Sequence, residues 1–178
     1  MTTTTTTTDL LVLLRDDHES LYAPQRNRRA FRDLLDAVPG ASRLTFSIVD
    51  WKDRLDRFHS KDIFFTDTAI RLLASGRVVV CDRLHAAILA YLAGLPFIYV
   101  DQISGKITKT LAVAMESGGS ACAQEGAQWA SATNLTDAIR QAVDFLERYQ
   151  LKATTTDRQQ QRRDKRQKKR NQQQANPS

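Results

Sequence analysis

Short, continuous apolar runs separated by helix-like segments are the feature that most constrains how this chain can fold. Three such runs are residues 10–14 (LLVLL), 78–80 (VVV) and 97–100 (FIYV). Runs of this kind are typical of strands covered on both faces. The pattern over residues 44–49 predicts a further strand. Helices are predicted over residues 25–38, 83–93 and 136–151, and a further helix, capped by Thr66 or Asp67, ends at residue 74. Strand–helix alternation predicts an α/β fold, a small doubly wound parallel sheet with helices on both faces.

The predicted domain covers residues 9–152 and lies between two segments of low complexity. Residues 1–8 are a methionine followed by seven threonines, and residues 153–178 form a basic, glutamine-rich tail that lacks Leu, Ile, Val, Phe, Trp and Tyr. Neither segment can contribute to a core, so we expect both to be disordered. The net charge of +6 is concentrated at the C-terminal end, because residues 151–178 hold nine basic and two acidic side chains.

This charge distribution gives only a weak indication of nucleic-acid binding, since the folded part is close to neutral. The run RRDKRQKKR fits a nuclear-localisation or RNA-binding patch, but a solvated extension has the same composition. No apolar run reaches the roughly 20 residues of a membrane-spanning helix, and no secretory signal is visible. We therefore expect no membrane span and, by default, a cytoplasmic protein, although the sequence does not fix the compartment.

Several familiar kinds of site are not indicated. The sequence contains neither the P-loop pattern nor the G-x-G-x-x-G pattern of dinucleotide-binding folds. Its two cysteines and three histidines show no metal-ligand spacing, so we assign no metal and no cofactor.

The first candidate site follows the strand at residues 78–80. Arg83 offers a planar fork for carboxylate or phosphate, and His85 can donate or accept a proton near neutral pH. A helix is predicted to begin here, and its N-terminus favours anions. Lys106 follows the next strand and is expected at the same edge of the sheet. In the alternative reading, Asp82 caps the helix, Arg83 pairs with Asp82 or Asp101, and His85 is an interior histidine.

A second candidate site follows the first strand, where Arg15, Asp17 and Glu19 gather charged side chains at the strand's carboxyl end. Capping of the following segment by Asp17 or Glu19 is an equally good explanation. Cys81 is best explained as a small buried apolar residue.

The string VVVCDRLHAAILAYLAGLPFIYVDQISGK resembles the C-terminal half of the polysaccharide pyruvyltransferase family. The resemblance rests on the Asp-Arg-Leu-His segment at residues 82–85, on Gly-x-Pro at 94–96 and on Gly-Lys at 105–106. The opening LLVLLRDDHE also resembles the family's strand followed by Arg-x-Asp-x-Glu, matched by Arg15, Asp17 and Glu19.

The resemblance implies one half of a two-domain fold similar to glycosyltransferases of the B type. It implies an enzyme that transfers a pyruvyl group from phosphoenolpyruvate to a sugar diol of a polysaccharide or glycan, forming a pyruvate ketal. Arg83, Leu84 and Lys106 would bind the donor's anionic groups, and His85 would be the catalytic residue.

The chain also departs from the family pattern, because the family's first domain is not found in it. The resemblance therefore implies a missing N-terminal domain or a second chain as a partner. The alternative function is a non-catalytic Rossmann-like module that binds a phosphorylated metabolite or a glycan.

Overall fold

The computed structural model describes residues 8–15, 21–49, 63–101, 104–117 and 129–148. It divides the chain into two compact units, Met1–Val143 and Asp144–Ser178. The first unit contains the whole sheet, and the described residues of the second, 144–148, are helical. The tail at residues 153–178 and the threonines before Thr8 lie outside the described residues, so their predicted disorder stays a prediction.

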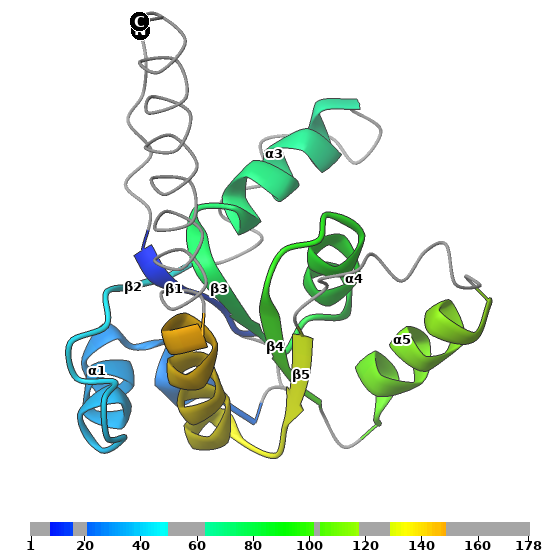
Figure 1. Cartoon of the computed structure of the whole chain (residues 1–178). Coiled ribbons are helices and arrows are strands. Elements are labelled where there is room, and N and C mark those ends of the chain that lie inside the picture. Colours follow the sequence, from blue (N-terminus) through cyan, green and yellow to red (C-terminus); the bar gives the residue numbers. More distant parts are fainter. Residues whose placement is uncertain (1–7, 16–20, 50–62, 102–103, 118–128, 149–178) are drawn as a thin grey trace, which may run out of the picture. The chain divides into compact units, whose positions relative to one another are not determined.

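The core of the first unit is a sheet of five parallel strands in the order β2-β1-β3-β4-β5 (Figure 1). The strands are β1 (Thr8–Leu13), β2 (Phe46–Ile48), β3 (Gly76–Cys81), β4 (Phe97–Val100) and β5 (Trp129–Ala132). The predicted α/β class and doubly wound parallel sheet are thus confirmed. The sequence did not predict β5, a short strand whose WASA segment is largely half-buried and forms no continuous apolar run.

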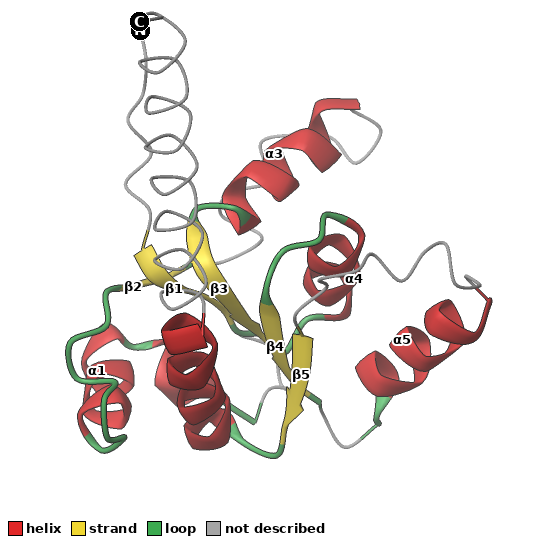
Figure 2. Ribbon diagram, viewed as in Figure 1, coloured by secondary structure: helices red, strands yellow, loops and turns green. Residues whose placement is uncertain are grey.

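Helices cover both faces of this sheet, as Figure 2 shows. The helical elements are η1 (Ala23–Arg26), α1 (Arg28–Asp36), α3 (Ile63–Leu73), α4 (Leu84–Leu92), α5 (Lys106–Ser117) and a last helix at residues 135–148. Helices α3, α4 and α5 lie on one face, whereas α1 and residues 135–143 lie on the other. The predicted cap of α3 was wrong, because the helix begins before Thr66 and Asp67. Asp67 instead pairs with Arg71 one turn later, at 2.8 Å.

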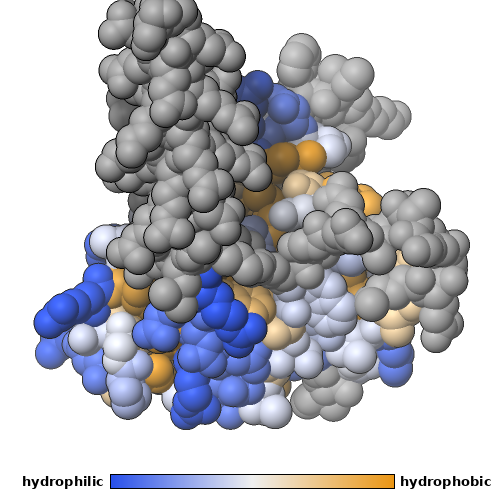
Figure 3. Space-filling model, in the orientation of Figure 1, coloured by the Kyte–Doolittle hydropathy of each residue, from blue (hydrophilic) through white to orange (hydrophobic). Residues whose placement is uncertain are grey.

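Alternate strand residues supply the apolar core on each face. Beneath α3, α4 and α5 the buried cluster comprises Leu11, Leu13, Val49, Leu73, Val79, Cys81, Ala86, Ala87, Ala90, Phe97, Tyr99, Ile107 and Leu111. On the opposite face, the ring of Phe31 in α1 lies 5.0 Å from that of Phe46 in β2. Outside this packing, α1 presents a hydrophilic surface (Figure 3).

The start of β3 requires glycine because it approaches β1 closely. A Cβ atom at Gly76 would lie 2.5 Å from the Cβ of Leu11, nearer than non-bonded carbon atoms can come. Val78 and Val80 then pair with Leu10 and Val12. The two strands are therefore held together over their whole length, and their carboxyl ends come out side by side.

Candidate functional site at the carboxyl ends of β1 and β3

The strand order reverses between β1 and β3. The chain moves outward from β1 to β2 in one direction and from β3 through β4 to β5 in the other. In open α/β sheets, the crevice at the carboxyl ends of the two strands at such a reversal is the usual ligand site. Arg15 follows β1, and Asp82 and Arg83 follow β3. The topology therefore brings the first-strand and third-strand candidates to one place.

A hydrogen bond from the backbone ties the two strand ends together. The backbone N–H of Arg15 donates to Oδ1 of Asp82 at 2.8 Å, and the N–H of Asp82 donates to the carbonyl of Leu13 at 3.3 Å. Asp82 is only 2% exposed, and among the described residues it is the one buried charged side chain. Its carboxyl group is thus fixed between β1 and the start of α4.

The environment of Asp82 disfavours its ionised form. Burial raises the pKa of Asp82 to about 6, although the N–H of Arg15 and the positive charges of Arg83 and Arg15 act in the opposite direction. Its second oxygen, Oδ2, is buried and accepts no hydrogen bond from the described part of the chain. Tyr22 also lies near, since burial and the charge of Asp82 raise the pKa of its phenol. Asp82 therefore belongs to a cluster with Arg15, Tyr22 and Arg83.

Helix α4 begins beside this cluster without a side-chain cap. Its N-cap residue is Arg83, whose side chain makes no capping hydrogen bond, so the predicted alternative in which Asp82 caps the helix is wrong. The N–H groups of the first turn have no partners within a helix. Together with the positive end of the helix dipole, they form a good environment for an anion.

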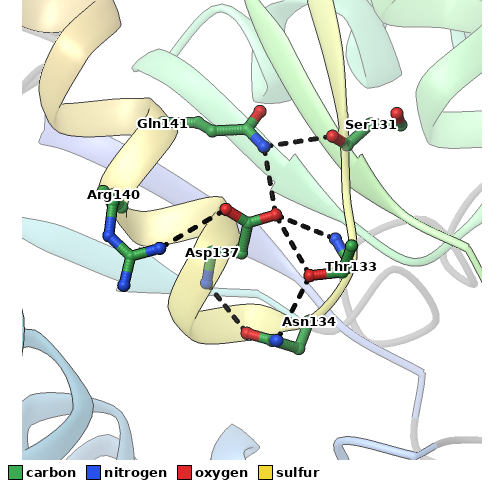
Figure 4. A network of polar contacts seen from close by, with 6 residues as sticks. All are labelled: Ser131, Thr133, Asn134, Asp137, Arg140 and Gln141. Carbon is green, nitrogen blue, oxygen red and sulfur yellow. Dashed lines mark hydrogen bonds and ion pairs between the residues drawn. The ribbon is translucent and has the colours of Figure 1, made fainter.

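Other helices of the chain satisfy their first turns with side chains. In α1, Oδ1 of Asn27 accepts the N–H of Arg29 at 2.8 Å. At the last helix, the sequence leaves Asn134 or Thr136 as the cap, and the structure selects Asn134, whose Oδ1 accepts the N–H of Asp137 at 2.9 Å. Figure 4 shows this helix start, where the Asp137 carboxylate also accepts bonds from the Thr133 backbone and from the Gln141 amide.

Helix α5 is capped from a distance by Asp101, the residue that follows β4. The Asp101 carboxylate accepts the N–H groups of Ile107 at 3.3 Å and Thr108 at 2.9 Å. Lys106 is the first residue of α5, and it is exposed. Since β4 is the parallel neighbour of β3, Lys106 lies at the same edge of the sheet as Arg83. The end of α5 itself, however, is already occupied by a carboxylate.

The three predicted site residues at the start of α4 (Arg83, Leu84 and His85) differ in exposure. Arg83 and Leu84 are half-buried, and Leu84 packs against the core cluster, which anchors the first turn. His85 is exposed, so its alternative reading as an interior histidine was wrong. His85 has no hydrogen-bond partner among the described residues. Asp17 and Glu19 lie outside the described residues, so of the second candidate site only Arg15 can be placed.

Cys81 takes no part in chemistry at this site. It is fully buried, and burial with the nearby charge of Asp82 raises the pKa of its thiol to about 12, so it stays protonated. The interpretation of Cys81 as a small apolar residue is confirmed. Within the described ranges, no group of three potential ligands could hold a metal ion, and no helix is long and apolar enough to cross a membrane.

Sequence reasoning missed two members of this cluster. Tyr22 precedes a 3-10 helix and carries no local signal. From the sequence, Asp82 is interpreted as a cap of the helix or as a partner of Arg83, yet a carboxylate directly after a buried strand, at a reversal of strand order, is itself a signal of a site.

Comparisons with known proteins agree with the position of this cluster. Residues 12–104 match the family model described as polysaccharide pyruvyl transferase, a range that includes Arg15, Arg83 and His85 and ends just before Lys106. Pyruvyl transferase 1 from Schizosaccharomyces pombe is 36% identical over 107 residues, which cover 54% of this chain.

This chain spans about a quarter of the length of that relative, since the alignment covers 25% of it. No solved structure matches the chain, so similarity to one half of a B-type glycosyltransferase stays a prediction. The family model, by contrast, covers more than half of the chain and the whole region in which β1, β3 and α4 form the candidate site. The chain therefore belongs to the polysaccharide pyruvyl transferase family.

Proposed function

We propose that this chain binds phosphoenolpyruvate and takes part in the transfer of its pyruvyl group to a sugar diol of a polysaccharide or glycan, with a pyruvate ketal as the product. The observation that carries the proposal is the start of α4, where Arg83 and His85 stand at a helix N-terminus without a side-chain cap. Phosphoenolpyruvate carries a phosphate and a carboxylate, the two groups for which an arginine fork and helix N–H groups are suited.

The chain's own residues have distinct roles in this proposal. Arg83 binds an anionic group of the donor, and the backbone N–H groups of Leu84 and its neighbours donate hydrogen bonds to it. Leu84 also anchors the turn through its packing against the core. Lys106 adds a positive charge from the start of α5, at the same edge of the sheet. Arg15, with Asp17 and Glu19, forms a secondary site after β1 in this proposal.

The chemistry requires one proton donor and a place for the leaving phosphate. His85 protonates the methylene carbon of the donor while a sugar hydroxyl attacks C2 and releases its own proton. Phosphate then leaves with the electrons of its bond to C2, and the second hydroxyl attacks the same carbon to close the ketal. One of the two hydroxyl protons returns to His85, and the other leaves with the phosphate. Arg83 and Lys106 stabilise the charge that develops on the phosphate.

Calorimetric titration with phosphoenolpyruvate tests donor binding. We expect the wild-type chain to bind and Arg83→Ala to lose binding by about 100-fold, the scale of a lost charge-assisted contact. Arg71→Ala is the matched control, because Arg71 is an exposed arginine on α3 whose guanidinium group pairs with Asp67 at 2.8 Å. Equal affinity in Arg83→Ala and wild type would contradict the proposal.

A turnover assay separates catalysis from binding. It uses this chain together with the part of its relative that the alignment does not cover. His85→Gln is expected to abolish ketal formation while it leaves donor affinity within about twofold, because the proton donor is not a main binding group. An active His85→Gln variant would refute its role as the acid.

A second candidate function is a non-catalytic module that binds a phosphorylated metabolite or a glycan. It is favoured by His85, which is exposed and is not oriented by any described residue, whereas catalytic acids are commonly held by a hydrogen-bond partner. Donor binding without turnover, unaffected by His85→Gln, is the result that this function predicts.

A further inference from the structure

The most unusual side chain beside the anion site is Asp82. It stands directly before Arg83, is 2% exposed and is held through Oδ1 by the backbone N–H of Arg15. Its Oδ2 has no hydrogen-bond partner among the described residues. An acidic group at a place suited to anions is electrostatically costly, so its presence there calls for an explanation.

The groups around Asp82 leave it poised between two charge states. Two guanidinium groups face it, Arg15 beyond the end of β1 and Arg83 at the start of α4, and both favour its ionised form. Tyr22 and Cys81 also lie near it, but the pKa of each is raised from an already basic value, so both are neutral at neutral pH. Burial acts against ionisation and brings the pKa of Asp82 to about 6. In the isolated chain at neutral pH, Asp82 is therefore mostly ionised, and its pKa lies only slightly below the pH.

A bound anion changes this balance in one direction. Its negative charge competes with Asp82 for Arg83 and repels the carboxylate. A second negative charge close to a buried carboxylate raises the cost of keeping that carboxylate ionised, so protonation of Asp82 becomes favourable. Asp82 is the group best placed to do this.

We propose that Asp82 is a proton-linked residue of the anion site: when an anion binds at the start of α4, the Asp82 carboxylate takes up one proton from solvent and becomes a neutral acid. The proposal rests on the anion site of the proposed function but not on the identity of the donor. Only proton transfer occurs: the new O–H bond forms on the carboxyl group, and the buffer supplies the proton.

The sign of the effect distinguishes this role from a purely structural one. Asp82→Asn keeps an oxygen that can accept the Arg15 N–H and removes the charge, so it resembles the protonated state. We expect it to bind an anion about tenfold more tightly than wild type at about pH 7.5, the equivalent of one pKa unit of linkage. If Asp82 only held the site in shape, the same substitution would weaken binding or leave it unchanged.

Sulfate is the best probe, because it keeps both negative charges throughout the pH range in which Asp82 titrates. Calorimetry in two buffers of different ionisation enthalpy gives the number of protons taken up per sulfate bound. We expect wild type to take up a substantial fraction of a proton near neutral pH and Asp82→Asn to take up less. Asp67→Asn, an equivalent substitution at an exposed carboxylate on α3, should behave as wild type.

A measurement on the wild-type chain avoids dependence on any variant. The carboxyl carbon of Asp82 can be titrated by NMR with and without sulfate, and its midpoint should move upward by about one pH unit when sulfate is bound. An unmoved midpoint, equal proton uptake in Asp82→Asn, or a folded wild-type chain that binds no sulfate would each overturn the proposal.

These results are separable from those for the donor. Sulfate binding with proton uptake but no affinity for phosphoenolpyruvate would retain the role of Asp82 and refute the proposed donor. Donor binding that depends on Arg83 but does not change the protonation of Asp82 would support the proposed donor and refute the role of Asp82.

Discussion

Strands β3 and β4 are neighbours that each end directly before an aspartate, and the two aspartates do opposite things. Asp101, after β4, is half-buried and caps α5 through the N–H groups of Ile107 and Thr108. Asp82, after β3, is buried, accepts the N–H of Arg15 just beyond the end of the adjacent strand β1, and leaves the start of α4 without a side-chain cap. The same residue type in equivalent positions thus stabilises one helix and leaves the other open to an anion.

This difference shows how a site can be placed on a sheet of otherwise similar units. Connections after parallel strands are commonly stabilised by caps worth about 1 kcal/mol each. The helix after β3 lacks this stabilisation, and a buried carboxylate lies beside its first turn. Both features lower the stability of the fold, and both occur at the reversal of strand order, where ligand sites of such sheets are found.

The largest effect is expected from removing the charge of Asp82. Its pKa is raised from 3.8 to about 6, so between these values the folded chain binds more protons than the unfolded chain, and the free energy of unfolding falls as pH rises. At about pH 7.5, Asp82→Asn should be more stable than wild type by up to about 3 kcal/mol, and near pH 4 the difference should be small. Urea unfolding of both chains at the two pH values measures this. If the difference in free energy of unfolding between Asp82→Asn and wild type did not grow with pH, this role of the Asp82 charge would be contradicted.

The second effect comes from giving α4 the kind of cap that other helices have. Arg83→Ser places a good N-cap residue at the helix start, so near pH 4, where Asp82 is neutral and does not depend on the charge of Arg83, the free energy of unfolding should rise by about 1 kcal/mol. The same change removes the guanidinium group, and affinity for phosphoenolpyruvate should fall by about 100-fold. Thermal unfolding near pH 4 and calorimetry at neutral pH, on one preparation, give both numbers. A variant that is more stable but binds more weakly would support the contrast between α4 and α5, and one that loses both stability and affinity would contradict it.

The third effect concerns the capped helix. Asp101→Ala removes the acceptor of two N–H groups and should lower the free energy of unfolding by about 1–2 kcal/mol, with little change in anion affinity. Asp101→Asn retains one acceptor oxygen and should lose less. If Asp101→Ala created a second anion site of equal strength at α5, the uncapped helix start alone would explain binding, and Arg83 would have no special part.

The smallest effect is expected at Lys106. Because this side chain is exposed, its charge is screened, and Lys106→Gln should weaken phosphoenolpyruvate binding by only about threefold to tenfold. Lys109→Gln is the control, since the Lys109 ammonium already donates to the carbonyl of Ser104 at 3.0 Å. A loss at Lys106 larger than that at Arg83 would move the centre of the site to α5.

The parts of this structure that local pattern determines could be predicted from the sequence. Buried parallel strands read as unbroken apolar runs, so β1, β3 and β4 were found. The cap of the last helix is narrowed to Asn134 or Thr136 by residue type and position, and Asn134 is the residue that caps it. Strand β5 has no such run, because only its last residue is buried.

The parts that depend on tertiary structure could not be predicted. Asp101 caps a helix that begins five residues later, beyond the reach of a rule that inspects the preceding residue. The bond between Arg15 and Asp82 joins positions that come together only because β1 and β3 are neighbours. The sequence could therefore name Arg83 and His85 as candidates but could not show that Asp82 lies buried among them.

The contrast between the two helix starts predicts that the start of α4, and not that of α5, binds the donor anion. Backbone amide NMR during a phosphoenolpyruvate titration tests it directly, because amides that donate to an anion shift strongly. We predict saturable shifts at Leu84, His85 and Ala86, with Ile107 and Thr108 nearly unchanged because they remain bonded to Asp101. Shifts confined to Ile107 and Thr108, or absent from both helix starts, would contradict the account.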